Sequence, residues 1–310
     1  MTSKLVLMCV GAVSCLAQAP LVTNVGNFIH NVGDLDRSVH FYRDVLGMEL
    51  QRPPGDWQTT EGVLKMYDSA GGKFRVASAQ IPGSPMRVEL AEFQDTDRKP
   101  VKRRWETAGT SVLMLTVADL ASVLERLKTA RVPMLENLKK TCDGRGVVVG
   151  DPDGFAVMLV ERGQPAGSPP SKSNFTSLRF GYLVSSDGME KGLFAALGLK
   201  AVTRTHICQP IEDALLNARG AASIVTLPGG FEIWLVKGKK QDAPIVVRPR
   251  DPGAAVLRLA VSDVDAAVQA LGQAKVKIVS AGGAIQTLPP AGLRAAILRA
   301  PDDLLIQVVK

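Results

Sequence analysis

The sequence repeats itself, and this repetition limits the possible folds more than any other feature. Leu115-Thr-Val-Ala-Asp119 matches Leu259-Ala-Val-Ser-Asp263, and Val32-Gly-Asp-Leu35 recurs as Val117-Ala-Asp-Leu120. Recurrence at a fixed spacing indicates one supersecondary unit used several times. The sequence therefore predicts four related units in two pairs, separated by the Pro-, Ser- and Gly-rich segment 163–174, which we interpret as a linker.

Each unit is predicted to contain a strand, a helix and further strands. Leu113, Leu115 and Val117 alternate with their neighbours, a period of two that is typical of a strand. Asp119 follows where a helix N-cap is expected, and apolar residues at helical spacing come after it. The turn sequence Asp151-Pro-Asp-Gly154 precedes the last apolar strand of the second unit. This order of elements favours an α+β fold.

Residues 1–19 have the pattern of a secretory signal peptide. An apolar run from Leu5 to Leu16 is followed by small residues that end at Ala19, as at a signal cleavage site. The run is shorter than the roughly 20 apolar residues that span a bilayer, so we expect no integral membrane span. The sequence predicts an exported protein, periplasmic or secreted. A lipoprotein anchored at Cys15 and an uncleaved anchor are the alternatives.

Cysteine content leaves the disulfide question open, and the charge pattern excludes one class of partner. Removal of residues 1–19 leaves only Cys142 and Cys208, and the sequence leaves open whether they form a disulfide. The chain carries a formal net charge of +7, but its basic runs contain no interleaved aromatic residues. We therefore expect no nucleic-acid partner.

Two motifs resemble the vicinal-oxygen-chelate (VOC) superfamily, which includes glyoxalase I, bleomycin-resistance proteins and extradiol dioxygenases. They are Asp34-Leu-Asp-Arg-Ser-Val-His-Phe-Tyr42, near the start of the chain, and Asp151-Pro-Asp-Gly-Phe155. The resemblance implies βαβββ modules paired edge to edge into cupped mixed sheets. It predicts four such modules in two tandem VOC domains, residues 21–162 and a degenerate second domain, residues 175–310.

Strand periodicity predicts which side chains line the two cups. In the first strand, Phe28 and Val32 belong to the more apolar face, which the helix should cover. Asn27 and Asn31 should then face the cup, and His30 should be a buried histidine on the helix side. The complete set of predicted cup residues is Asn27, Asn31, Glu89, Met114, Met158, Glu232, Trp234, Arg258 and Gln307.

The resemblance also implies metal-ligand positions in each cup. Carried over to this sequence, these are Asn27, Glu89, Val112 and Met158 in the first domain, and a position near Leu178 with Glu232, Val256 and Gln307 in the second. Each set contains a single carboxylate, whereas a divalent ion needs several oxygen or nitrogen donors. We therefore predict no metal site and no cofactor.

Three functions remain open from the sequence. The first is an exported, bleomycin-resistance-like protein, monomeric or homodimeric, that binds a small organic molecule in an apolar cup without a metal. The second is a VOC enzyme, a lyase, isomerase or dioxygenase-type oxidoreductase, with Glu89 or Glu232 as general base or weak metal ligand. The third is a structural or interaction module whose cups are filled by its own side chains.

The candidate polar residues also have purely structural interpretations. Glu89 could hydrogen-bond to Asn27 or Asn31, or pair with a nearby arginine, as the remnant of a metal site. Arg258 could bind an anion or a planar ring beside Trp234, or it could form an ion pair with Glu232 that only fills space.

Overall fold

The structure is a computed structural model, and it describes residues 20–81, 84, 86–162, 174–186, 189–203, 209–217, 222–239, 245–289 and 292–310. The predicted signal segment with Cys15, almost all of the linker, and Cys208 lie outside these residues. No helix in the described part of the chain has the length and apolar character needed to cross a membrane. Cys142 is disulfide-bonded.

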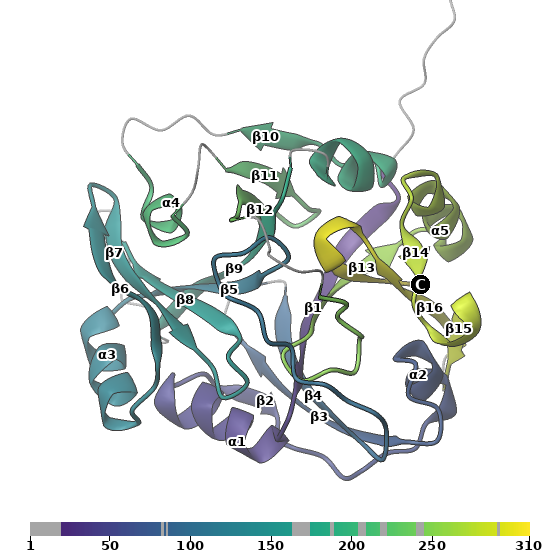
Figure 1. The fold of residues 1–310 in the computed structure, drawn as a ribbon, viewed down its shortest axis with the longest axis horizontal. Helices are drawn as coiled ribbons and strands as arrows, with labels where there is room; N and C mark the ends of the chain where they lie inside the picture. The colour runs from purple at the N-terminus through teal and green to yellow at the C-terminus, as the bar shows by residue number, and fades with distance from the viewer. Residues whose placement is uncertain are drawn as a thin grey trace, which may run out of the picture.

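The four predicted units are present, and the α+β class is confirmed (Figure 1). The first unit consists of β1 (Val22–Val32), α1 (Leu35–Val39) continued by the π-helical turn η1 (His40–Val45), β2 (Leu50–Arg52), α2 (Glu61–Met66), β3 (Lys73–Gln80) and β4 (Arg87–Gln94). The second consists of β5 (Ser111–Val117), α3 (Leu120–Thr129), β6 (Met134–Thr141), β7 (Gly144–Gly150) and β8 (Ala156–Glu161).

The second half of the chain repeats this order. The third unit consists of β9 (Phe175–Val184), the π-helical η2 (Glu190–Phe194), β10 (Ala201–Thr203), α4 (Ile211–Leu215), β11 (Ser223–Thr226) and β12 (Glu232–Lys237). The fourth consists of β13 (Ala255–Val261), α5 (Val264–Gln273), β14 (Lys277–Ile278), η3 (Ala281–Gly283), β15 (Gln286–Leu288), β16 (Leu293–Arg299), η4 (Pro301–Asp303) and β17 (Leu305–Val309).

Aspartate caps begin the main helices, as the sequence predicts. The side chain of Asp34 accepts a hydrogen bond from the backbone N–H of Arg37 at the start of α1. Asp119 caps α3 in the same way, and Asp263 caps α5. Each cap satisfies a backbone donor that the first helical turn leaves unpaired.

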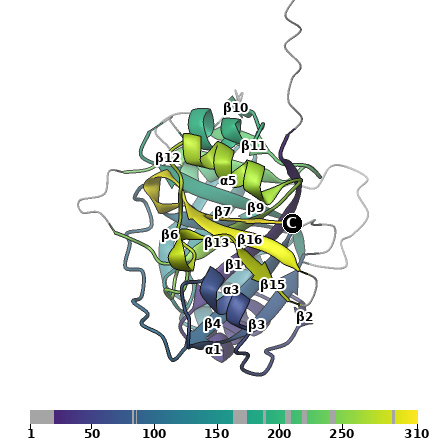
Figure 2. The ribbon, with the colours of Figure 1, turned by 90° about the vertical axis from the view of Figure 1, so that its right-hand side faces the viewer.

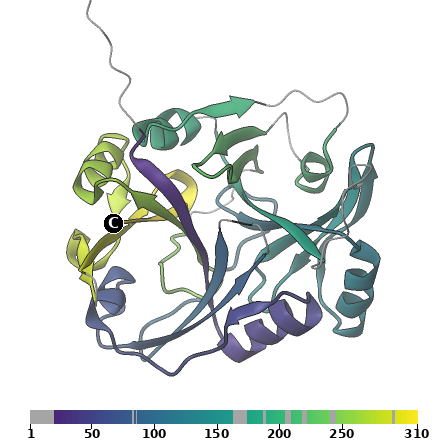
Figure 3. The same ribbon diagram turned by 180° about the vertical axis from the view of Figure 1, so that it is seen from behind.

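The sheets join the first unit to the fourth and the second to the third. The first sheet has the strand order β14-β16-β17-β13-β1-β4-β3-β2, and β15 pairs with β16. The second sheet has the order β10-β11-β12-β9-β5-β8-β7-β6. The long strand β1 runs through the middle of the first sheet, antiparallel to β13 (Figures 2 and 3). Each sheet therefore takes one unit from each half of the chain, while the boundaries 21–162 and 175–310 stay a prediction.

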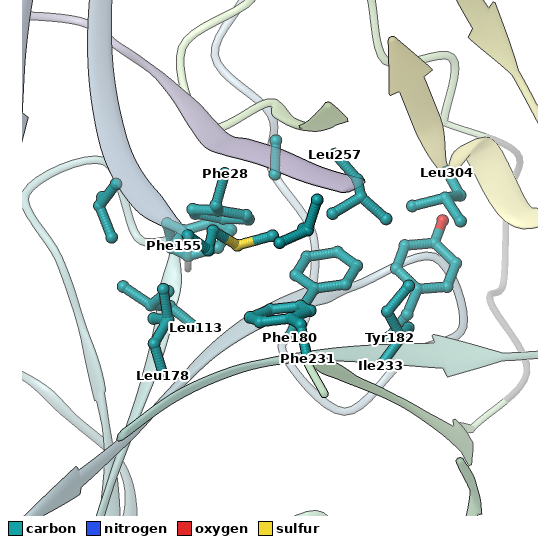
Figure 4. Close-up of a cluster of buried hydrophobic side chains, with 14 of the residues drawn as sticks. Phe28, Leu113, Phe155, Leu178, Phe180, Tyr182, Phe231, Ile233, Leu257 and Leu304 are labelled. Carbon is teal, nitrogen blue, oxygen red and sulfur yellow. The ribbon is translucent and has the colours of Figure 1, made fainter. Parts of the chain in front are cut away.

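The main core lies between the two sheets and contains buried side chains from all four units. Phe28 of β1 and Leu257 of β13 face Leu113 of β5 and Phe180 of β9 (Figure 4). The rings of Phe28 and Phe180 lie with their centroids 5.4 Å apart. These residues occupy the faces that strand periodicity assigned to the interior, so the opposite face of each sheet forms a cup that points away from this core.

Candidate functional site

The first cup is the face of the first sheet opposite the main core, and most of it is apolar. Ile29, Phe93 and Val256 lie in a separate buried cluster on this face. Leu64 and Met66 of α2 belong to the same cluster, and α2 packs against β15 and β16 of the fourth unit. The location of Ile29 confirms the predicted face of β1.

Four polar side chains form the polar end of this cup: Asn27, Glu89, Arg258 and Gln307. Asn27 Nδ2 donates to Glu89 Oε2 at 2.8 Å, and Arg258 Nε donates to Gln307 Oε1 at 2.8 Å. Arg258 Nη2 lies 3.5 Å from Glu89 Oε1. Glu89 and Arg258 reach solvent, with side-chain exposures of 19% and 24%, whereas Gln307 is buried. The polar end thus offers a carboxylate and a guanidinium next to each other.

Tyr67 completes the polar end, and sequence analysis missed it. It follows α2 and is buried at 3% exposure, close enough to Arg258 for the guanidinium charge to act on its hydroxyl. Burial raises the pKa of Tyr67, an effect that the Arg258 charge partly offsets. Its hydroxyl therefore remains protonated at neutral pH. No motif marked this residue, because it lies outside the strands whose period-two pattern was analysed.

Gly26 makes room for the Arg258 side chain. A Cβ atom at this position would lie 2.7 Å from Arg258 Cγ and 2.9 Å from Cδ. Real Cβ contacts are not this short, so any other residue would push the arginine away from its present place. The observed position of the Arg258 side chain in β13 therefore depends on the glycine at position 26 in β1.

The donors at the polar end do not suit a divalent ion. Asn27 donates to one oxygen of Glu89, and the Arg258 guanidinium faces the other. Gln307 uses its carbonyl oxygen to accept from Arg258, and Val256 has no donor atom. A metal ion here would meet a single carboxylate and the positive charge of Arg258, which the ion would repel.

The second cup combines different residues from those expected. Met114 and Met158 lie in its buried apolar cluster with Val112 and Trp234. The expectation that these two methionines share a cup with Glu89 is therefore wrong. Strand periodicity gives the face of a strand correctly, but the partner strand depends on the pairing of the units.

Strand register also corrects two positions in the third unit. Phe180 of β9 pairs with Leu113 of β5 in the second sheet, just as Phe28 of β1 pairs with Leu257 of β13 in the first. The residue equivalent to Asn27 is therefore Arg179, which places the position expected near Leu178 one residue further along the chain. Leu178 is buried in the main core instead.

The position equivalent to Glu89 in this unit also holds a different residue from the one expected. Phe180 pairs with Ile233 as Phe28 pairs with Val88, so Trp234, not Glu232, takes the position of Glu89. The carried-over positions of the second cup contain no oxygen donor: they are Val112, Met158, Arg179 and Trp234.

Glu232 and Arg258 are not partners, because they lie on different sheets. Glu232 accepts from Trp234 Nε1 at 3.1 Å and lies 3.3 Å from Arg179 Nε. The Arg179 guanidinium also lies 5.8 Å from the centre of the Trp234 ring. The arrangement predicted for Arg258 beside Trp234 is thus made by a different arginine.

The helix α4 covers the apolar cluster of the second cup, and ion pairs fasten the helix to the sheet. Glu212 of α4 is only 1% exposed and pairs with Arg162 and with Arg179, the latter at 3.1 Å. Arg162 also contacts Asp143 at 2.6 Å, and Ile211 and Leu215 fill the apolar cluster beneath the helix. Among the described residues, α4 thus covers the buried apolar cluster of this cup, while Arg179 and Glu232 reach solvent with side-chain exposures of 25% and 15%.

A third group of ionisable residues is buried behind β1. His30 is fully buried, and its Nε2 lies 2.6 Å from Asp151 Oδ2, while Nδ1 lies 3.4 Å from the carbonyl oxygen of Ala254. Both ring nitrogens face acceptors, so the doubly protonated imidazolium is the form that satisfies them. The prediction of a buried, hydrogen-bonded histidine is confirmed.

The Asp151-Pro-Asp-Gly turn holds this group together. Asp151 Oδ1 accepts from the backbone N–H groups of Asp153 and Phe155 at 2.9 and 2.8 Å, and Tyr42 donates to Oδ2 at 3.3 Å. Burial lowers the pKa of His30, but the charge and hydrogen bond of Asp151 raise it by more, and the net pKa is raised.

This group is also where the described residues could hold a metal ion. One donor atom each of His30, Asp151 and Asp153 lies within 4.8 Å of the others. A metal would need the lone pair of a deprotonated His30, whose nitrogens face hydrogen-bond acceptors. The observed contacts fit a buried ion pair better than a ligand set.

Comparison with known proteins agrees with this geometry. Residues 25–159 match the family model of the Glyoxalase/Bleomycin resistance protein/Dioxygenase superfamily. A 2-epi-5-epi-valiolone epimerase from an Actinomyces species is 29% identical over 161 residues, which cover 48% of this chain and 84% of the relative. Glyoxalase I from Zea mays shares the fold, with a TM-score of 0.63 at 16% identity, covering 93% of this chain and 92% of that one.

Residues 25–159 thus match the glyoxalase/bleomycin resistance/dioxygenase (VOC) superfamily, and the chain as a whole has a fold similar to that of glyoxalase I. The four βαβββ units of the chain form two mixed sheets, as in tandem members of the fold.

Proposed function

We propose that this protein binds a small organic molecule at the polar end of the first cup, without a divalent metal ion in that cup. The observation that carries this proposal is the adjacent Glu89 and Arg258, both in reach of solvent at one end of an otherwise apolar cup. The second cup also has an arginine and a glutamate in reach of solvent, Arg179 and Glu232, but Arg179 is already paired with the buried Glu212 of α4. One cup then serves the ligand and the other stabilises the fold.

A thermal-shift screen of chelator-treated protein tests the proposal. A ligand present at about a hundred times its Kd should stabilise the folded state by about 2.7 kcal/mol. Stabilisation should change in Glu89→Gln, which removes the charge beside Arg258, and should be unchanged in Glu125→Gln, a matched change on the exposed surface of α3. Binding that needs an added divalent cation, or that survives Glu89→Gln unchanged, would contradict the proposal.

An enzymatic function is the second candidate, and the epimerase relative favours it. Epimerisation next to a carbonyl needs a base that removes a proton and a donor that stabilises the resulting oxyanion. Glu89 supplies a carboxylate, and Arg258 supplies a cation 3.5 Å from it.

Deuterium exchange separates catalysis from binding alone. NMR in D₂O would follow deuterium incorporation beside the carbonyl of 2-epi-5-epi-valiolone. An enzyme should incorporate deuterium with the wild-type chain and lose this activity in Glu89→Gln. Glu232→Gln should have no effect on exchange, since Glu232 lies in the second cup.

We also propose that the protein is exported, with a lipid anchor at Cys15 as the alternative. The support is the pattern of residues 1–19 alone. Fractionation of cells that express the full chain would test export, and a Cys15→Ala variant that leaves the membrane fraction would favour the anchor. Because both sheets are completed within one chain, a monomer is the simplest assembly.

A further inference from the structure

We infer that the ligand of the first cup is an organic anion, whose carboxylate or enolate oxygen accepts hydrogen bonds from Arg258. This inference rests on the proposed function and adds the charge class of the ligand. In a metal-dependent cup the cation is a bound ion, whereas the cation proposed here is the Arg258 side chain.

The Arg258 guanidinium has more N–H donors than its contacts inside the protein use. It uses Nε on Gln307 and lies close to Tyr67, and its distance to Glu89 is 3.5 Å. A charge-assisted hydrogen bond normally measures about 2.7–2.9 Å, so the pair with Glu89 is loose. A guanidinium carries five N–H donors in a planar fork that suits two oxygens of one carboxylate. A ligand oxygen could therefore bind without breaking the contact to Gln307.

The surroundings hold Arg258 in place for such a role. Gly26 leaves the space through which the side chain runs, and Gln307, which is 1% exposed, fixes Nε. Gln307 is itself fixed, because its Nε2 donates to Met66 Sδ at 2.9 Å. The Tyr67 hydroxyl is a further donor beside the guanidinium. A preorganised set of donors loses little entropy when it binds an anion.

Glu89 would act on the other side of the ligand. It lies next to the guanidinium, so an anion held by Arg258 would place its neighbouring atoms near the carboxylate. Half-buried Val63 and Val76 belong to the cluster of this cup and offer apolar surface to the rest of the molecule. A small ring with one acidic group matches both features.

Three aromatic probes of similar size test the charge class: benzoate, benzyl alcohol and benzylamine. The methionine methyl groups report the place of binding, because Met66 lies in the first cup whereas Met114 and Met158 lie in the second. In NMR spectra of protein labelled at the methionine methyl carbon, benzoate should shift the Met66 signal and leave the other two unchanged. Benzoate should bind about tenfold or more tightly than benzyl alcohol, and benzylamine should not bind.

Variants of Arg258 complete the experiment. Arg258→Gln should abolish the preference for benzoate, and Arg258→Lys should retain part of it because the charge remains. Arg131→Gln, which removes an equal charge from the exposed surface of the second unit, should leave binding unchanged. Circular dichroism and thermal melting would verify that each variant is folded.

The outcomes distinguish this inference from the proposed function. Equal shifts of the Met66 signal by benzoate and benzyl alcohol would overturn the anion preference while leaving a ligand site in the first cup. Shifts confined to Met114 and Met158, or no shift with any probe, would overturn both. A benzoate preference that persists in Arg258→Gln would show that another group binds the anion and would also overturn the inference.

Discussion

Substitution of His30 by leucine should destabilise the protein, because it leaves the buried Asp151 carboxylate without its cation. The side chains of His30 and Asp151 both have an exposure of 0%, and they are 2.6 Å apart. In the fourth unit a leucine, Leu259, occupies the equivalent position of β13 and is fully buried. The substitution therefore tests charge more than packing.

The size of the expected loss in stability depends on the hydrogen bonds that Asp151 keeps in the variant. Loss of one partner of a buried ion pair costs about 3–5 kcal/mol. Asp151 would retain the N–H groups of Asp153 and Phe155 and the hydroxyl of Tyr42. We therefore expect a loss near the lower limit, about 3 kcal/mol in the free energy of unfolding. The double variant His30→Leu/Asp151→Asn should recover part of this loss, because it no longer buries a lone charge.

The pH dependence has a defined sign. The pKa of His30 is raised in the folded state above its ordinary value of 6.5. The pair therefore contributes its full stability below the unfolded pKa, and this contribution is lost as the pH rises through the folded pKa. The wild-type chain should lose stability across this window, whereas His30→Leu should be nearly flat.

Urea denaturation followed by circular dichroism at several pH values measures both effects. His40→Gln is the matched control, because His40 also contacts an aspartate, Asp44, at 2.8 Å, but its side chain is 67% exposed. Exposed pairs of this kind contribute little to stability. Equal effects of the His30 and His40 substitutions, or a His30→Leu variant as stable as the wild type at pH 6, would refute the reasoning.

Three further predictions follow from the structure. Gly26→Ala should weaken benzoate binding in the methionine NMR experiment, since the new Cβ would displace Arg258; unchanged affinity would contradict the close contact. Glu212→Gln should lower the thermal midpoint through a loss of about 1–3 kcal/mol, since it weakens the buried contact with Arg162, yet benzoate should still shift Met66. Asp263→Ala should cost about 1 kcal/mol in urea denaturation through loss of the α5 cap, and Asp263→Asn should cost less.

The sequence by itself determined the local features of this protein. The repeat predicted four units, aspartates marked the starts of the helices, and the period of two placed Phe28 in the core and Ile29 in a cup. These features depend on residues close together in the chain, so a single sequence contains the information. The buried state of His30 followed from the same periodicity.

The tertiary structure alone decided which units share a cup. The first strand of a unit can pair antiparallel with the first strand of any other unit, and the alternation of side chains is the same in each case. Pairing of β1 with β13 brought Arg258 to Glu89, and pairing of β5 with β9 gave Met158 a different cup. The site depends on contacts between residues far apart in the chain, and the packing of four similar units against one another selects those contacts.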